Sequence, residues 1–162
     1  MSVLLDEGTL QRYIEEVLKP AYQRKHAILM SAVRQFLLPL GVKIQGVGDD
    51  GLESKTSEDG KAVFGGYFIW LLLPTNISAI ELSSLCLSQE NLIIAPGHLF
   101  EVQGDATLQF QHEARLCFAW EKEGELREGV ERMGKVLKRL VDGEYVGDEE
   151  KKGNGVDVGE FK

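Results

Sequence analysis

The chain has 162 residues, of which 43% are hydrophobic and 27% charged, as is typical of a globular protein with a substantial core. Its formal net charge of −8 at pH 7 argues against a nucleic-acid partner and an anionic membrane surface, because both favour basic patches. No apolar run approaches the roughly 20 residues that span a bilayer, and the N-terminus lacks the features of a signal peptide. We therefore expect a cytoplasmic protein in which Cys86 and Cys117 are reduced thiols, in preference to a disulfide.

The N-terminal part of the chain predicts a long helix with an irregularity in its middle. Apolar residues recur at helical spacing from Thr9 onward. Pro20 interrupts this pattern, since a proline removes a backbone donor and crowds the preceding turn. We expect a kink or a break near Lys19 and an end to the second segment by Pro39.

Two longer strands and two shorter ones are predicted downstream. Residues 67–73 are apolar on both faces, so we expect a strand buried in the centre of a sheet. Residues 114–120 have a two-residue period, which places small residues and Arg115 on one face. The other, bulkier face consists of Ala114, Leu116, Phe118 and Trp120. Shorter strands are expected over 42–47 and 91–95.

Two further helices follow from capping and charge patterns. Ser78 and Glu81 form a Ser-x-x-Glu capping box, which opens a helix. The apolar side of this helix is Ile80, Leu82, Leu85 and Cys86. The last helix begins near Glu123 and carries acidic residues first and basic residues later, as the helix dipole favours. Within it, Gly129 and Gly134 weaken the helix but permit close packing.

The order of elements predicts an α+β fold with helices packed on a small, mainly antiparallel sheet. We expect one domain over residues 1–145 and a disordered acidic tail over 146–162. The acidic, glycine-containing segment over 48–62 is expected to be a mobile loop.

Arg115 is the candidate binding residue. It is the only lysine or arginine between Lys61 and Lys122, in the most apolar part of the chain. A guanidinium keeps its proton, so a buried one needs an anionic or strongly accepting partner, and its planar fork suits a carboxylate. A structural ion pair, an edge-strand arginine pointing to water and a ligand site all fit this pattern.

Other catalytic signatures are missing from the sequence. No serine, cysteine or threonine has the setting of an activated nucleophile, and no phosphate-binding loop is present. His26, His98 and His112 are too scattered for a zinc site. We predict no catalytic and no metal-binding residue.

Four stretches, in chain order, resemble the C-terminal small domain of class I/II aminotransferases, the fold-type I enzymes that use pyridoxal phosphate. They are residues 18–26, 65–74, 94–100 and 114–119. These resemble the family patterns Leu-Arg-x-x-Tyr-x-x-Arg-Arg, Gly-Gly-x-Phe-x-Trp-x-x-Leu-Pro, Val-x-Pro-Gly-x-x-Phe and Leu-Arg-Leu-Ser-Phe-Ser. The resemblance covers roughly residues 5 to 142.

The resemblance implies a role for Arg115. In that family the arginine of the last strand binds the α-carboxylate of the substrate, and Arg115 stands at the matching position. Tyr67, Phe68 and His98 lie in segments similar to those that border the family's active-site cleft, so contact with substrate is implied for them as well. A role as core or hinge residues is the alternative.

The family's cofactor domain has no counterpart in this sequence. That domain carries the Schiff-base lysine, the aspartate that pairs with the pyridine nitrogen, and most phosphate contacts. Pyridoxal phosphate serves the complete family enzyme, so we expect this chain alone to bind none and to be inactive.

Two functions remain open. The first is the substrate-side domain of an aminotransferase, which moves an amino group between an amino acid and a 2-oxo acid. The chain would then be a fragment, a truncated gene product or a split polypeptide, with a cofactor-domain partner or a homodimer implied. The second is a non-catalytic, stand-alone domain that binds a partner protein or a small carboxylate. The identity of the amino acid does not follow from the sequence.

Overall fold

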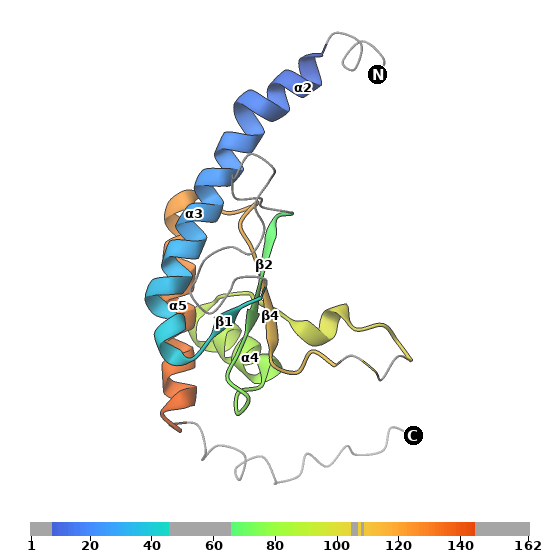
Figure 1. The fold of residues 1–162 in the computed structure, drawn as a ribbon. Coiled ribbons are helices and arrows are strands. Elements are labelled where there is room, and N and C mark those ends of the chain that lie inside the picture. Colours follow the sequence, from blue (N-terminus) through green and yellow to red (C-terminus); the bar gives the residue numbers. More distant parts are fainter. Residues whose placement is uncertain (1–7, 46–65, 105–106, 108, 145–162) are drawn as a thin grey trace, which may run out of the picture.

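The computed structural model describes residues 8–45, 66–104, 107 and 109–144 (Figure 1). The loop expected over 48–62 and the tail expected over 146–162 lie outside the described residues. Among the helices that the model describes, none combines the length and the apolarity that crossing a bilayer requires.

The N-terminal helix is continuous, and its irregularity lies where the sequence predicts it. A short α-helix, α2 (Thr9–Tyr13), passes through a π-helical turn, η1 (Ile14–Leu18), into α3 (Lys19–Phe36). The amide of Lys19 donates to the carbonyl of Ile14, five residues earlier, so the widened turn ends just before Pro20. Because proline has no N–H and its ring crowds the preceding turn, a wider turn accommodates it without a break.

The sheet has four antiparallel strands in the order β1-β2-β4-β3, which confirms the predicted fold class. Their bounds are β1 Lys43–Ile44, β2 Phe68–Leu72, β3 Ala95–Pro96 and β4 Glu113–Cys117. The strand predicted over 91–95 is shorter than expected. Asn91 ends the preceding helix in a left-handed conformation and the Leu92 amide still bonds to Cys86, so the chain reaches β4 only at Ala95.

The two remaining helices begin where their caps predict. Helix α4 (Ala79–Glu90) starts at Ser78, whose hydroxyl accepts a hydrogen bond from the Glu81 amide at 3.5 Å. Helix α5 spans Glu123–Val141. A short 3₁₀ helix, η2 (Leu38–Leu40), follows α3, and another, η3 (Gly97–Phe100), follows β3.

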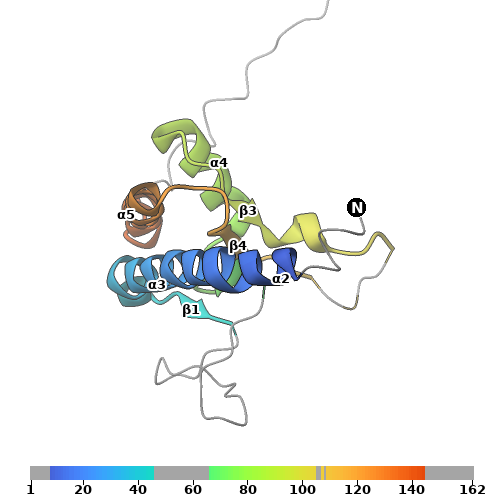
Figure 2. The ribbon, with the colours of Figure 1, turned by 90° about the horizontal axis from the view of Figure 1, so that it is seen from above.

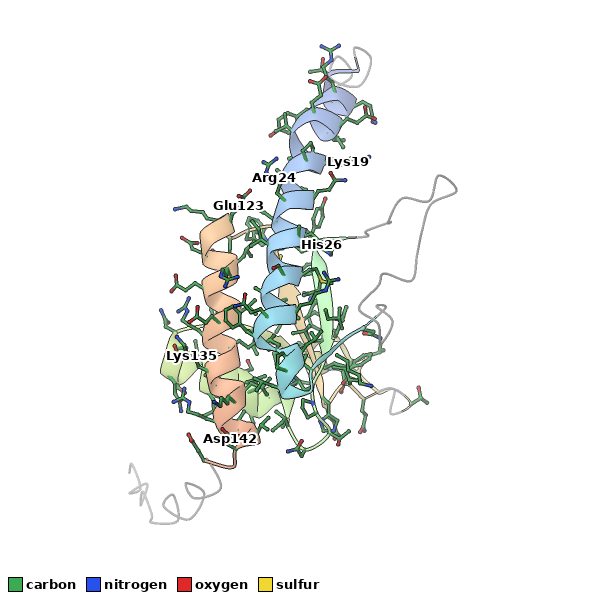
Figure 3. All side chains as sticks on the ribbon, turned by 60° about the vertical axis from the view of Figure 1, so that its left-hand side comes forward. Lys19, Arg24, His26, Glu123, Lys135 and Asp142 are labelled. Carbon is green, nitrogen blue, oxygen red and sulfur yellow. The ribbon has the colours of Figure 1, made fainter. Side chains whose placement is uncertain are left out.

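Helices α3 and α5 lie side by side and share one core with α4 and one face of the sheet (Figures 1 and 2). A Cβ atom on Gly134 of α5 would lie 3.3 Å from both the Cβ and the carbonyl oxygen of Phe36, so this glycine lets α5 approach α3 closely. Arg24 of α3 and Glu123 of α5 form an ion pair at 3.4 Å near the start of α5 (Figure 3). Cys86 is buried in this core, and burial raises the pKa of its thiol to about 12, which keeps it protonated.

The helices leave the other face of the sheet open, and this corrects two predictions. Residues of β2 are buried on one face only: Ile69 and Leu71 point to the core, whereas Phe68 and Leu72 are exposed. The apolar stretch is therefore central in the sheet but not covered on both sides. Trp120 is 88% exposed and not part of the core, because β4 ends at Cys117 and the chain then turns toward α5.

Candidate functional site

The candidate site lies on the open face of the sheet. Arg115 of β4 stands directly opposite Trp70 of β2 and Ala95 of β3. Opposed residues of antiparallel strands point to the same face, and so do residues two apart in one strand. Cys117 and its partner Phe68 consequently share that face with Arg115. This surface lies away from α3 and α5, as the sequence predicts for Arg115.

Two phenyl rings hold the guanidinium of Arg115. Its Cζ atom lies 3.9 Å from the ring centroid of Phe68 and 3.7 Å from that of Phe100, which belongs to η3. These distances place the guanidinium carbon in van der Waals contact with both rings. Within the described residues, no carboxylate forms an ion pair with Arg115. Among the described residues, the guanidinium is contacted by aromatic rings, and no acceptor for its N–H groups is found.

The ring of Phe100 is itself held by neighbouring aromatic side chains. Trp70 packs its ring edge-on against Phe100, with centroids 5.2 Å apart, and also lies 5.8 Å from Phe110. The Glu101 carboxylate accepts a 2.7 Å hydrogen bond from the Phe110 amide. Gly97 leaves no room for a side chain, since a Cβ there would lie 2.5 Å from the Cβ of Phe110. Helix η3 is thus fixed against the segment that leads into β4.

A cavity of about 480 Å³ adjoins Arg115 at the edge of β4. It lies between β4, the irregular segment 91–94 and the first half of α5. Its wall is mostly apolar and includes Ile93 and Trp120, with the carboxylates of Glu121 and Glu125 also contributing. The space beside Arg115 is large enough for a small organic acid.

The structure brings together only some of the residues that the sequence singles out. Tyr67 packs against Tyr22 of α3, with ring centroids 5.0 Å apart, so its ring lies on the helix side and not beside Arg115. His98 is exposed on η3, the same short helix that carries Phe100. Phe68 does contact Arg115.

Sequence reasoning missed Phe100 as a contact of Arg115. The available signal was its place at the end of the Pro-Gly-x-x-Phe stretch, but nothing in the spacing shows that this stretch crosses over β4. No group of three or more potential metal ligands gathers among the described residues.

Comparisons with known proteins agree with this architecture. No family model matches the chain. Over 135 residues, or 83% of the chain, it is 30% identical to the uncharacterised protein YER152C of Saccharomyces cerevisiae. Over 78 residues, or 48% of the chain, it is 37% identical to a 2-aminoadipate transaminase of Thermus thermophilus. The chain spans 26% and 18% of the lengths of these two relatives.

Solved structures show the same relation. The α-aminoadipate aminotransferase LysN of Thermus thermophilus matches with a TM-score of 0.63 and 27% identity, over 86% of this chain and 30% of LysN. The kynurenine aminotransferase of Pyrococcus horikoshii matches with a TM-score of 0.64 and 24% identity, over 85% of this chain and 28% of its own. The chain has the fold of the small domain of class I/II pyridoxal-phosphate-dependent aminotransferases.

Among the described residues, the contacts of Arg115 include no lysine of the kind that holds pyridoxal phosphate in aminotransferases. Such enzymes hold the cofactor through a lysine amine, and the residues in contact with Arg115 are the phenylalanines Phe68 and Phe100. Among the residues of the four strands, the one lysine is Lys43. It lies on the edge strand β1, which β2 separates from the Arg115 strand β4. Lys25 of α3 donates a 2.8 Å hydrogen bond to the Ala119 carbonyl.

Proposed function

We propose that this chain is the substrate-side domain of an aminotransferase and that Arg115 binds the carboxylate of its substrates. The main support is the guanidinium held between Phe68 and Phe100 with no carboxylate partner among the described residues. A cation that keeps its charge, on an apolar surface, with its donors unused, is suited to an incoming anion.

The geometry favours a carboxylate over other acceptors. Both rings contact the central carbon of the guanidinium, and along the edge of this group two parallel N–H groups match the two oxygens of a carboxylate. Amino acids and 2-oxo acids share this group, so a single arginine serves both substrates of an amino-group transfer. The chain's own residues orient the substrate by its carboxylate and surround it with aromatic walls.

The amino-group transfer needs a second component. Pyridoxal phosphate supplies the electron sink for this chemistry in the enzymes that contain it. We propose that it is held by a cofactor domain outside this chain and that the chain by itself is inactive. A non-catalytic, partner-binding role is a second possibility, and the apolar side chains exposed along the N-terminal helix favour it. These are Leu10, Tyr13, Ile14 and Val17.

Titration of the full chain with pyruvate tests the carboxylate site. We expect the side-chain Nε–H signal of Arg115 to shift in a saturable way, because the in-plane donors engage the carboxylate. Arg115→Ala should weaken binding at least about thirtyfold, since the loss of a charge pair costs roughly 2–5 kcal/mol. Arg115→Lys should restore only part of it, because an ammonium lacks the fork.

Arg127 provides a matched control. Its Cζ also lies over a phenyl ring, 5.0 Å from the centroid of Phe36, but on the helix side of the molecule. The Arg127 Nη2 donates a 2.9 Å hydrogen bond to the Oε1 of Gln35. Arg127→Ala should leave pyruvate binding unchanged. Equal binding by the wild-type chain and Arg115→Ala, or binding lost equally with Arg127→Ala, would show that Arg115 is not the carboxylate site.

A further inference from the structure

We infer that Phe100 is a positioning residue, which fixes the plane of the Arg115 guanidinium so that its N–H edge meets the substrate carboxylate. The inference deepens the proposed function and rests on it. Its basis is the contact of the Arg115 Cζ with two rings, at 3.7 Å from the Phe100 centroid and 3.9 Å from the Phe68 centroid.

The two rings have different origins, and this singles out Phe100. Phe68 is a residue of β2 and stands opposite Cys117 in the same sheet as Arg115. Phe100 arrives from η3, outside the sheet, and closes over the arginine from there. Without this second ring the guanidinium would keep Phe68 as its aromatic contact among the described residues. The ring of Phe100 therefore decides whether the arginine has one orientation or several.

The placement of Phe100 is enforced by its surroundings. The absence of a side chain at Gly97 allows η3 to lie directly against Phe110 and the Glu113 carbonyl. The hydrogen bond from the Phe110 amide to Glu101 closes the other end of η3. The Trp70 ring, edge-on to Phe100 at 5.2 Å, restricts rotation of the phenyl group. The close packing at Gly97, the Phe110–Glu101 hydrogen bond and the Trp70 ring therefore fix the position of the Phe100 ring beside Arg115.

Prior ordering of the arginine has a consequence for affinity. An arginine free in solvent loses rotamer freedom when it binds a carboxylate, whereas one already fixed between two rings does not. Removal of one ring should also remove a cation–π contact that is modest at a partly exposed site. We expect Phe100→Leu to weaken carboxylate binding about two- to fivefold. Phe100→Tyr keeps the ring and should bind like the wild type.

The experiment uses the full chain and pyruvate as the probe. Spectra of the arginine side chains are recorded for the wild type, Phe100→Leu and Phe100→Tyr, and the dissociation constant is measured for each. The ring current of Phe100 should displace the Arg115 Nε–H signal, so the signal should move in Phe100→Leu and stay in Phe100→Tyr. Arg127, stacked on the unaltered Phe36 ring, provides an internal control whose signal should not move.

The outcomes separate this inference from the proposed function. An unmoved Arg115 signal or unchanged pyruvate affinity in Phe100→Leu overturns the positioning role and leaves the carboxylate site standing. No pyruvate binding by the wild-type chain overturns the carboxylate site and, with it, the inference. A mere packing defect would move the signals of Arg115 and Arg127 together and lower affinity equally in Phe100→Tyr, which also overturns it.

Discussion

Substitution of Gly97 by alanine tests whether η3 is locked onto the sheet. A Cβ at this position would meet the Phe110 Cβ at 2.5 Å, the Phe110 carbonyl oxygen at 2.7 Å and the Glu113 carbonyl oxygen at 2.9 Å. Two of these three atoms belong to the backbone, so no side-chain rotation relieves the overlap. Either η3 moves away from the sheet, or the segment leading into β4 shifts.

The expected cost follows from these contacts. Extra atoms forced into a packed region destabilise a protein by about 1–3 kcal/mol, and overlap with backbone places Gly97→Ala near the upper end. For a chain of this size, about 1 kcal/mol corresponds to roughly 2–4 °C in Tm, so we expect a decrease of about 6–12 °C. Displacement of η3 also removes the Phe100 ring from Arg115, so pyruvate affinity should fall as in Phe100→Leu.

Gly129→Ala is the matched control for thermal unfolding. A Cβ on Gly129 would lie 3.5 Å from the Leu92 Cδ1, an ordinary contact, and alanine favours a helix over glycine by about 1 kcal/mol. This variant should therefore gain roughly 2–4 °C in Tm. A Tm for Gly97→Ala within about 2 °C of the wild type, measured alongside a stabilised Gly129→Ala, would refute the close packing of η3.

Two further predictions concern the N-terminal helix and the cofactor. Amide hydrogen exchange should be faster over residues 9–19 than over 29–38, because α2 and η1 contain no buried residue whereas α3 buries Leu29, Met30, Ala32 and Val33. Equally slow exchange would mean that the exposed helix is covered, for instance by a second copy of the chain. Incubation with pyridoxal phosphate, borohydride reduction and peptide mapping should give no single stoichiometric lysine adduct, since no lysine contacts the Arg115 site among the described residues. One preferred lysine together with turnover would contradict the predicted inactivity of the chain.

Local signals predicted most of the elements correctly. A side chain that acts on its own stretch of backbone marks each correctly predicted feature. These features are the cap at Ser78, the irregularity before Pro20 and the start of the last helix at Glu123. The structure also distinguishes Gly134 from Gly129 in α5, since Gly134 faces the α3 backbone closely and Gly129 faces one flexible leucine. Spacing alone does not separate them.

The errors arise where burial depends on neighbours distant in the sequence. The alternation in β4 correctly places Ala114 and Phe118 in the core, but it extends to Trp120 only if the strand continues past Cys117. The run over 67–73 reads as doubly buried because hydrophobicity does not reveal which face the helices cover. The covering elements α3, α4 and α5 all lie on one side, so half of that run faces the open surface.

The exposed half of β2 also explains how the chain tolerates Arg115 in its most apolar region. A buried arginine is expected to need an anionic or strongly accepting partner. In the structure, Arg115 instead contacts the rings of Phe68 and Phe100. A carboxylate partner would have used the N–H groups and made the arginine structural. The phenyl rings contact the guanidinium carbon, and no described residue accepts a hydrogen bond from the donors along the edge of this group. Phe68 and Phe100 on the open face therefore stabilise the Arg115 cation without occupying the donors that a ligand would use.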